Sequence, residues 1–159
     1  MGDGDSLSEE NRTRFASIIH HSPDQETNDL TKAFKFALGL NPTKITILGA
    51  TGAREDHTLG NISLLADYAK VFDNIETVTD YGIFTSHSDT FTMDSVPRQQ
   101  ISIFAFDPTL KIESAGLVYP TGSVIFDRWW KATLNEASST SFTLTFSHKA
   151  EVLVFRAFV

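Results

Sequence analysis

The segment of residues 49–61 holds the densest group of side chains suited to phosphate chemistry. It reads GATGAREDHTLGN and contains Arg54, Asp56, His57 and, one turn later, Asn61. Glycines let a backbone approach a phosphate, the amides of a following helix attract anions, and a guanidinium matches phosphate oxygens. Neither a Walker A loop nor the glycine pattern of dinucleotide-binding folds is present. The segment therefore predicts a phosphate site of another type, although His57 alone is more typical of a capping or packing residue.

Acidic residues in two earlier segments are suited to a divalent cation. Asp3 and Asp5 lie two residues apart, and carboxylate oxygens are preferred ligands of hard cations. The alternative for that segment is a helix start capped by Ser6. Asp29 and Lys32 are three residues apart at the start of a predicted helix and share one of its faces. Here the alternative is a surface ion pair.

A fourth group lies in the second half, where Gly-Leu-Val-Tyr-Pro at residues 116–120 precedes Trp129, Trp130, Thr133 and Asn135. Paired tryptophans in a β domain usually anchor a core or an interface, and one of them can also stack on a flat heterocycle. Thr133 and Asn135 are polar residues of the kind that turns contain. The residues alone leave these interpretations open.

The elements expected to position these groups alternate in the first half of the chain. We predict helices over residues 7–20, 28–38 and 57–71, and strands over residues 44–49 and 75–79. Asn28 is a suitable N-cap for the second helix, which Gly39 and Pro42 end. Alternation of this kind is typical of a parallel sheet covered by helices, which binds ligands at the carboxyl ends of its strands. The strand over residues 44–49 is expected to be buried.

The second half changes to short β-rich runs, which predict an antiparallel sandwich or barrel. These runs cover residues 83–86, 90–93, 100–106, 110–113, 123–126, 141–146 and 151–158. We therefore expect an α/β fold class, with a parallel-sheet α/β domain at residues 1–81 and an antiparallel β-sandwich domain at residues 82–159. Two domains of this size have small cores and are expected to lean on each other or on a partner chain.

Composition excludes several classes of function. The 159 residues contain no cysteine, which removes disulfides, thiol catalysis and Cys-ligated metals. The formal charge of −7 argues against a nucleic-acid partner. Because the sequence lacks an apolar run of membrane-spanning length and a signal-peptide pattern, we expect a cytoplasmic protein without membrane partners.

Taken together, the four segments resemble the thiamine pyrophosphokinase (thiamine diphosphokinase) family. The family's motifs run Gly-Asp-x-Asp-Ser, an acidic loop with Gln before Thr-Asp-x-x-Lys-Ala, Gly-Ala-x-Gly-Gly-Arg-x-Asp-His-x-x-x-Asn, Gly-Leu-x-Tyr-Pro and a late Ser-Asn. The corresponding positions here are residues 2–6, 25–33, 49–61, 116–120 and 133–135. The resemblance implies transfer of a diphosphate from Mg-ATP to the hydroxyethyl group of thiamine, giving thiamine diphosphate and AMP. It also implies a homodimer whose active site lies between chains.

The resemblance assigns roles residue by residue. The Mg²⁺ ligands would be Asp3, Asp5 and Asp29, and the ATP-binding residues would be Asn28, Lys32, Arg54, His57 and Asn61. The thiamine-facing residues would be Gln25, Asp56, Trp130, Thr133 and Asn135, and catalysis would depend on Asp29, Arg54 and Asp56. Positioning and charge neutralisation dominate phosphoryl-type transfer, so carboxylates and a guanidinium suit the reaction.

The sequence departs from the family pattern at a few positions. Asn28 replaces Thr, Ala53 replaces the second Gly before Arg54, and Leu134 replaces the Ser of Ser-Asn. The family also has about fifty residues before its first motif, so the α/β domain is expected to be truncated at its start. Two alternatives follow: a diphosphokinase for another hydroxyalkyl heterocycle such as a pterin, and an inactive fragment that binds ligand or dimerises.

Overall fold

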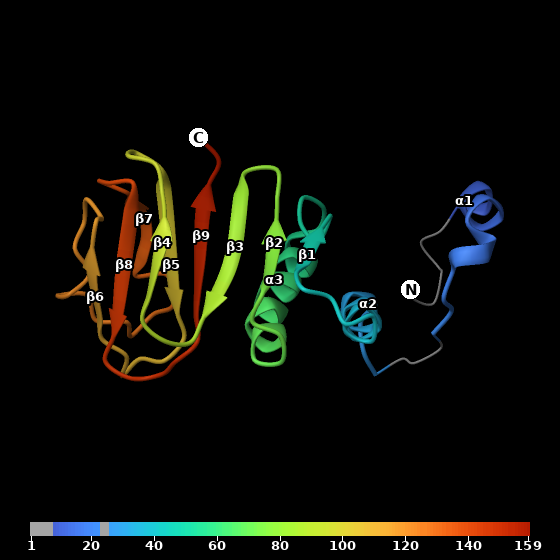
Figure 1. Cartoon of the computed structure of the whole chain (residues 1–159), viewed down its shortest axis with the longest axis horizontal. Coiled ribbons are helices and arrows are strands. Elements are labelled where there is room, and N and C mark those ends of the chain that lie inside the picture. Colours follow the sequence, from blue (N-terminus) through green and yellow to red (C-terminus); the bar gives the residue numbers. More distant parts are fainter. Residues whose placement is uncertain (1–7, 23–25) are drawn as a thin grey trace. The chain divides into compact units, whose positions relative to one another are not determined.

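The computed structural model describes residues 8–22 and 26–159, and Figure 1 shows the chain. The chain divides into two units, Met1–Ile45 and Thr46–Val159, each of which is described by itself. Three of the predicted site residues, Asp3, Asp5 and Gln25, lie outside the described residues.

The described residues of the first unit form two α-helices and a short 3₁₀ helix. Helix α1 (Glu9–Arg14) is followed by the 3₁₀ helix η1 (Ala16–Ile18), so the helix predicted over residues 7–20 is shorter and is interrupted at Phe15. Since α1 buries none of its residues, no packed apolar face stabilises a longer helix. Helix α2 (Asp29–Leu38) confirms the second predicted helix, with the Asn28 Oδ1 accepting a hydrogen bond from the Thr31 N–H at 2.8 Å.

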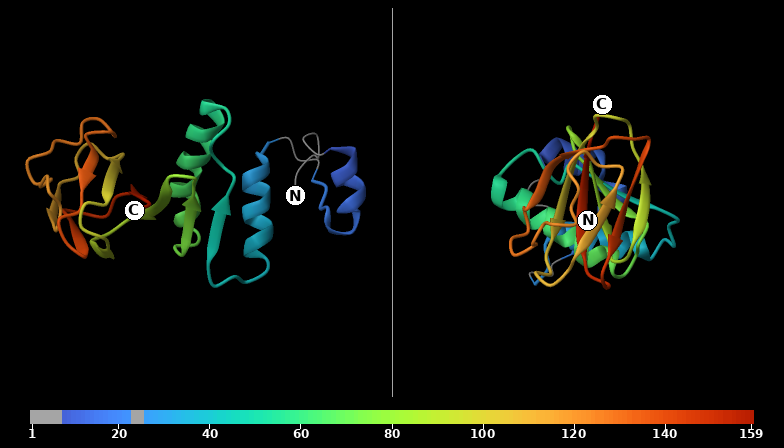
Figure 2. Two further views of the ribbon diagram at one scale, coloured as in Figure 1. Left: turned by 90° about the horizontal axis from the view of Figure 1, so that it is seen from above. Right: turned by 90° about the vertical axis from the view of Figure 1, so that its left-hand side faces the viewer.

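The second unit begins within strand β1 (Ile45–Leu48), which opens a β–α–β connection. Strands β1 and β2 (Ile75–Val78) are neighbours in one sheet and are joined through helix α3 (Glu55–Ala69), the connection typical of parallel strands. The helix packs on β2 and on the next strand, β3 (Gly82–His87) (Figure 2). It begins two residues earlier than predicted, because Glu55 and Asp56 already suit its first turn.

Antiparallel strands complete two sheets. The first sheet has six strands in the order β1-β2-β3-β9-β5-β7, and the second has three in the order β4-β8-β6. The remaining strands are β4 (Phe91–Asp94), β5 (Gln100–Ala105), β6 (Ile112–Ala115), β7 (Ala132–Glu136), β8 (Ser141–Phe146) and β9 (Val152–Ala157). Because β2 pairs antiparallel with β3, the six-stranded sheet is mixed. A single sheet thus continues from the α/β part into the predicted sandwich.

The main core lies between the two sheets. Ile103 of β5 pairs with Val154 of β9, and both side chains are fully buried in one cluster with Phe142 and Leu144 of β8. The opposite face of the sheet carries Phe104 of β5, which pairs with Leu153, and Phe84 of the neighbouring strand β3, which pairs with Phe155. Period-two alternation therefore gives the six-stranded sheet one face for the sandwich and a second, aromatic face for α3 and a loop.

Three strand predictions need correction. The strand over residues 44–49 forms, but it is not buried as a whole: Ile47 is buried whereas the Leu48 side chain is 71% exposed. Residues 123–126 form no strand: a turn at residues 122–123, in which the Val124 N–H donates to the Thr121 carbonyl, is followed by irregular backbone. Strand β7 is not among the strands predicted from the sequence, because its residues Thr133 and Asn135 are of the kind that turns contain.

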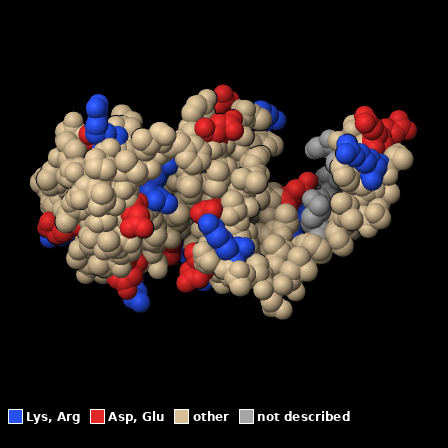
Figure 3. Space-filling view, turned by 45° about the horizontal axis from the view of Figure 1, so that its top comes forward, with Lys and Arg blue, Asp and Glu red and all other residues tan. Residues whose placement is uncertain are grey.

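The surface mixes the two signs of charge. On the face shown in Figure 3, basic side chains stand in small groups with acidic groups nearby. Within residues 8–22 and 26–159, no helix has both the length and the apolar character needed to cross a membrane.

Candidate active site

The turn of residues 49–54 (the 49–54 turn) links the end of β1 to the start of α3. Gly49 and Gly52 adopt φ of 68° and 89°, a region that favours glycine, and a Cβ at either position would meet open space. The Asn61 side chain donates a hydrogen bond from Nδ2 to the Ala50 carbonyl at 2.8 Å. The predicted ATP-binding residue Asn61 thus holds the backbone of the turn in place from the second turn of the helix.

Arg54 and Asp56 form a two-pronged ion pair beside this turn. Nε of Arg54 lies 3.1 Å from Oδ1 of Asp56, and Nη2 lies 2.6 Å from Oδ2. The Arg54 guanidinium lowers the pKa of Asp56, so the carboxylate is ionised at neutral pH. Both side chains are largely exposed, as is His57. The pair lies at the N-terminus of α3, where backbone amides and the helix dipole favour anions.

The first unit carries the predicted residues Asn28, Asp29 and Lys32. The Asn28 side chain caps α2, and the Lys32 Nζ lies 3.1 Å from Oδ1 of Asp29. The Lys32 side chain is 7% exposed, whereas that of Asp29 is 52% exposed. The surface ion pair considered from the sequence is therefore half-buried. Among the described residues, no group of three His, Asp or Glu side chains is close enough to hold a metal.

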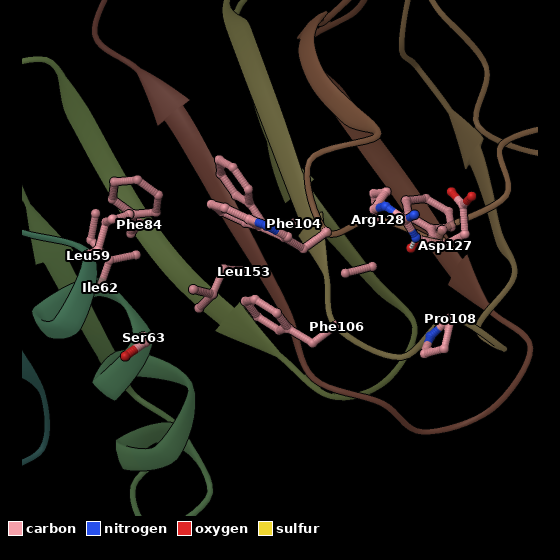
Figure 4. A pocket seen from close by; sticks show the side chains of 13 residues that line it. Leu59, Ile62, Ser63, Phe84, Phe104, Phe106, Pro108, Asp127, Arg128 and Leu153 are labelled. Carbon is pink, nitrogen blue, oxygen red and sulfur yellow. Dashed lines mark hydrogen bonds between the residues drawn. The ribbon is translucent and has the colours of Figure 1, made fainter. Parts of the chain in front are cut away.

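An apolar pocket of about 640 Å³ lies on the aromatic face of the six-stranded sheet (Figure 4). Leu59 and Ile62 of α3 form one wall, Phe84 and Phe104 line the sheet side, and Trp129 closes a third side. The Trp129 ring centroid lies 5.5 Å from that of Phe104, at an interplanar angle of 31°.

Asp56 lies on the face of α3 that borders this pocket, since it precedes Leu59 by three positions and Ser63 by seven. None of the pocket-lining phenylalanines is among the site residues predicted from the sequence. The alternation of Ser102, Phe104 and Phe106 with buried residues was the signal that could have identified this second face.

Strand β7 and the turn that precedes it carry the remaining predicted residues. Trp130 is 53% exposed, with the Lys131 Nζ 5.9 Å from its ring centroid, and the Thr133 hydroxyl donates to the Trp130 carbonyl at 3.0 Å. Asn135 is 4% exposed, and its amide bonds the backbone of Tyr119 and Glu136. The predicted contact of Asn135 with a ligand stays a prediction, but its geometry indicates a second role.

Within the second unit the predicted residues therefore form two separate groups. Arg54, Asp56 and Asn61 gather beyond the end of β1, whereas Thr133 and Asn135 lie on β7 and Trp130 lies in the turn just before it. These strands are the two edges of the six-stranded sheet (Figure 1). Five inter-strand steps separate them, which is about 24 Å at the usual strand spacing.

Family models match almost the whole chain. Residues 1–79 match "Thiamin pyrophosphokinase, catalytic domain", and residues 82–155 match "Thiamin pyrophosphokinase, substrate-binding domain". The chain belongs to the thiamine pyrophosphokinase family. Within this family assignment, Asn28, Asp29, Lys32 and the group at the 49–54 turn fall in the catalytic-domain match. The group on β7 falls in the substrate-binding match.

Named relatives support the same family. The chain is 42% identical over 80 residues to the thiamine pyrophosphokinase of Bacillus subtilis, an alignment that covers 48% of this chain and 36% of that protein. It is 35% identical over 80 residues to thiamine pyrophosphokinase 1 of Oryza sativa subsp. japonica, covering 44% of this chain and 30% of that protein. These alignments span about a third of the length of either relative.

Solved structures of the family extend the likeness to nearly all of the chain. The crystal structure of the Bacillus subtilis thiamine pyrophosphokinase superposes with a TM-score of 0.82 at 26% identity, covering 98% of this chain and 76% of that one. A thiamin pyrophosphokinase family protein from Enterococcus faecalis reaches 0.86 at 20% identity, covering 99% and 78%, and shows the shared fold. The predicted combination of an α/β part with an antiparallel sandwich is thereby confirmed.

Proposed function

We propose that this chain transfers the terminal diphosphate of Mg-ATP to the hydroxyethyl oxygen of thiamine, giving thiamine diphosphate and AMP. Family membership supports the reaction class. The observation that carries the proposal is the exposed pair of Arg54 and Asp56 beside two positive-φ glycines at a helix N-terminus. We assign catalysis to residues 1–81 and thiamine binding to residues 82–159, and we place the reaction in the cytoplasm.

In the proposed reaction the thiamine hydroxyl oxygen attacks the β-phosphorus of ATP. The bond from this phosphorus to the oxygen shared with the α-phosphate breaks, AMP leaves, and the hydroxyl proton passes to solvent. Asp56 accepts a hydrogen bond from the hydroxyl and orients it, because a carboxylate with a lowered pKa stays ionised and is a weak proton acceptor. Arg54 binds phosphate oxygens, and Asn61 keeps the 49–54 turn in position.

Asn28, Lys32 and His57 contribute further contacts to ATP in this proposal. Lys32 brings a cationic ammonium group to the polyphosphate, and Asn28 offers a polar cap at the start of α2. Asp29 suits Mg²⁺ because its side chain is half exposed and its carboxylate oxygens are hard ligands. The proposed ligand set is completed by Asp3 and Asp5. Magnesium, when bound there, would neutralise charge on the transferred phosphates.

We further propose that the chain acts as a homodimer, with each site formed by two chains. The phosphate group at the end of β1 and the ring-binding group on β7 lie at opposite edges of one sheet, about 24 Å apart. A single thiamine molecule is too short to contact both groups of one chain. A second copy that brings its β7 to the 49–54 turn would complete the site, with Trp130, Thr133 and Gln25 facing thiamine.

The test is to incubate the chain with Mg-ATP and either thiamine or a hydroxymethylpterin, and to quantify AMP and the diphosphorylated product by chromatography. We expect AMP and a diphosphorylated product in the mixture that contains thiamine, and neither in the mixture that contains the pterin. Product with the pterin alone would support the alternative substrate, which Leu134 favours because an exposed apolar side chain stands in place of a hydroxyl. Thiamine binding without AMP from either mixture would indicate a chain that binds ligand without catalysis.

A further inference from the structure

Strand β7 contains an irregularity at the residues assigned to thiamine binding. Ile101 of β5 pairs with Asn135 and Ile103 pairs with Ala132, so two residues of β7 stand opposite Ser102. Leu134, one of the two, has a φ of 60°, its N–H donates to the Ser102 hydroxyl at 3.1 Å, and its side chain is 79% exposed. This is a β-bulge, which redirects side chains and interrupts regular backbone pairing.

The Asn135 amide makes up for the interrupted pairing on the other edge of β7. Its Oδ1 accepts from the Tyr119 N–H at 3.1 Å and from the Glu136 N–H at 2.8 Å, and its Nδ2 donates to the Tyr119 carbonyl at 2.7 Å. Both backbone groups of Tyr119 are therefore bound by one side chain. A facing strand residue would normally supply these two bonds.

The segment of residues 116–120 (the 116–120 segment) is thereby held along β7 and its continuation. The Val118 N–H donates to the Glu136 carbonyl at 2.8 Å, Leu117 forms an antiparallel bridge with Ala137, and the Ser138 N–H donates to the Gly116 carbonyl at 2.9 Å. Asn135 adds the next contact in this series. Leu117 points into the core, whereas the Tyr119 side chain is 63% exposed.

Asn135 has little capacity left for a ligand. It is 4% exposed, its Oδ1 already accepts two hydrogen bonds, and one of its two amide hydrogens is bound to a carbonyl. Tyr119, in contrast, presents an aromatic ring on a backbone that is fixed at both its N–H and its carbonyl. The thiazolium ring of thiamine is a cation, and aromatic faces attract cations.

We propose that Asn135 is a positioning residue and that Tyr119 is the ligand-contacting side chain it holds in place. This inference rests on the proposed function, because it names the thiazolium of thiamine as the group that Tyr119 contacts. It adds a residue to the site and reassigns another: Tyr119 touches the ring, and Asn135 acts through the backbone of the 116–120 segment.

A double-mutant cycle in the KM for thiamine tests the ligand half of the inference. Asn135→Ala and Tyr119→Ala are each expected to raise that KM roughly tenfold and to leave the KM for ATP unchanged. The double variant is expected to match Tyr119→Ala, since Asn135 has nothing left to position. If the double variant instead raised the KM for thiamine about a hundredfold, the product of the two single effects, Asn135 would contact thiamine independently and the inference would be overturned.

Two control variants separate the aromatic ring from general surface effects. Tyr119→Phe retains the ring and is expected to keep the wild-type KM for thiamine. Tyr81→Ala removes another exposed tyrosine, at the turn between β2 and β3, and is expected to leave both KM values unchanged. If Asn135→Ala does not fold, Asn135→Asp replaces it, because it keeps the acceptor oxygen and loses the donor to Tyr119.

Amide hydrogen exchange tests the positioning half without any ligand. In Asn135→Ala the amides of Val118 and Tyr119 are expected to exchange more than tenfold faster, while those of β9 keep their rates. Unchanged exchange at Tyr119 would refute the positioning role. If the wild-type chain neither binds thiamine nor forms AMP, the proposed function and the contact with Tyr119 both fail, and the exchange result still decides the role of Asn135.

Discussion

Asp29, at the first turn of α2, forms an ion pair with a largely buried lysine, Lys32. The Lys32 ammonium lies 3.1 Å from Asp29, and its side chain is almost fully removed from water. Burying an unpaired charge is costly, so Asp29 partly compensates the charge of Lys32 as well as offering oxygens to a cation. An amide at position 29 would still accept the hydrogen bond of Lys32 but would no longer be a strong Mg²⁺ ligand.

We therefore expect Asp29→Asn to lower kcat at least about a hundredfold while changing the melting temperature by only a few degrees. AMP release and thermal unfolding measure the two effects. Asp67→Asn is the matched control, because Asp67 pairs with Lys70 at the same i,i+3 spacing on α3 and is assigned no role in the site. Near-normal turnover by Asp29→Asn would remove Asp29 from the proposed metal site.

At the scale of elements, the 49–54 turn depends on backbone conformations that only glycine adopts readily. Gly52 has a φ of 89°, where any Cβ adds strain of about 1 kcal/mol or more, although the space around it is open. Gly52→Ala is expected to shift the turn and raise the KM for ATP several-fold, as steady-state kinetics would show. Gly60→Ala on α3 is the control, because a Cβ at that position also meets open space. This helical substitution should raise the free energy of unfolding by about 0.5–1 kcal/mol. An unchanged KM for ATP in Gly52→Ala would mean that the turn does not position the phosphates.

The same elements show what the sequence could and could not predict. Helix α2 was predictable because Asn28, the apolar spacing and Gly39 all agree. Strand β7 was not, because its bulge breaks the period-two pattern and its polar residues are those of turns. The group at the 49–54 turn was predictable because its residues lie in one short segment. The pocket and the role of Asn135 depend on strands far apart in the chain, whose pairing no local pattern reveals.

The whole molecule places its two groups of site residues on opposite edges of one sheet, which leads to a prediction about mixed dimers. In the proposed dimer, Arg54→Ala damages the phosphate-binding half of each site and Trp130→Ala damages the thiamine-binding half. After the two are unfolded together and refolded, half of the dimers should contain both types of chain, each with one intact site. About a quarter of the wild-type activity is then expected. A mixture no more active than its components would show that each site uses residues of one chain.

The stability of the whole molecule is expected to depend on pH through a histidine that lies where the chain passes from the six-stranded to the three-stranded sheet. His87 at the end of β3 stacks on Phe91 of β4, with ring centroids 3.7 Å apart and an interplanar angle of 12°. Its Nε2 lies 3.0 Å from the Thr85 hydroxyl. Burial, and then the positive charge of Arg156, lower the pKa of His87 to about 4.

Because this pKa lies below the value of about 6.5 for an unfolded histidine, the unfolded chain takes up the proton first as the pH falls. The contribution of neutral His87 to stability is therefore complete above pH 6.5 and is lost progressively down to pH 4, by about 3 kcal/mol in all. Urea unfolding at pH 7 and pH 4.5 measures it, with His87→Gln as the comparison. The variant keeps every other ionisable group. The difference in the free energy of unfolding between wild type and variant should therefore be markedly smaller at pH 4.5 than at pH 7. An equal difference in the free energy of unfolding at both pH values would mean that His87 has the same pKa in the folded and unfolded chain.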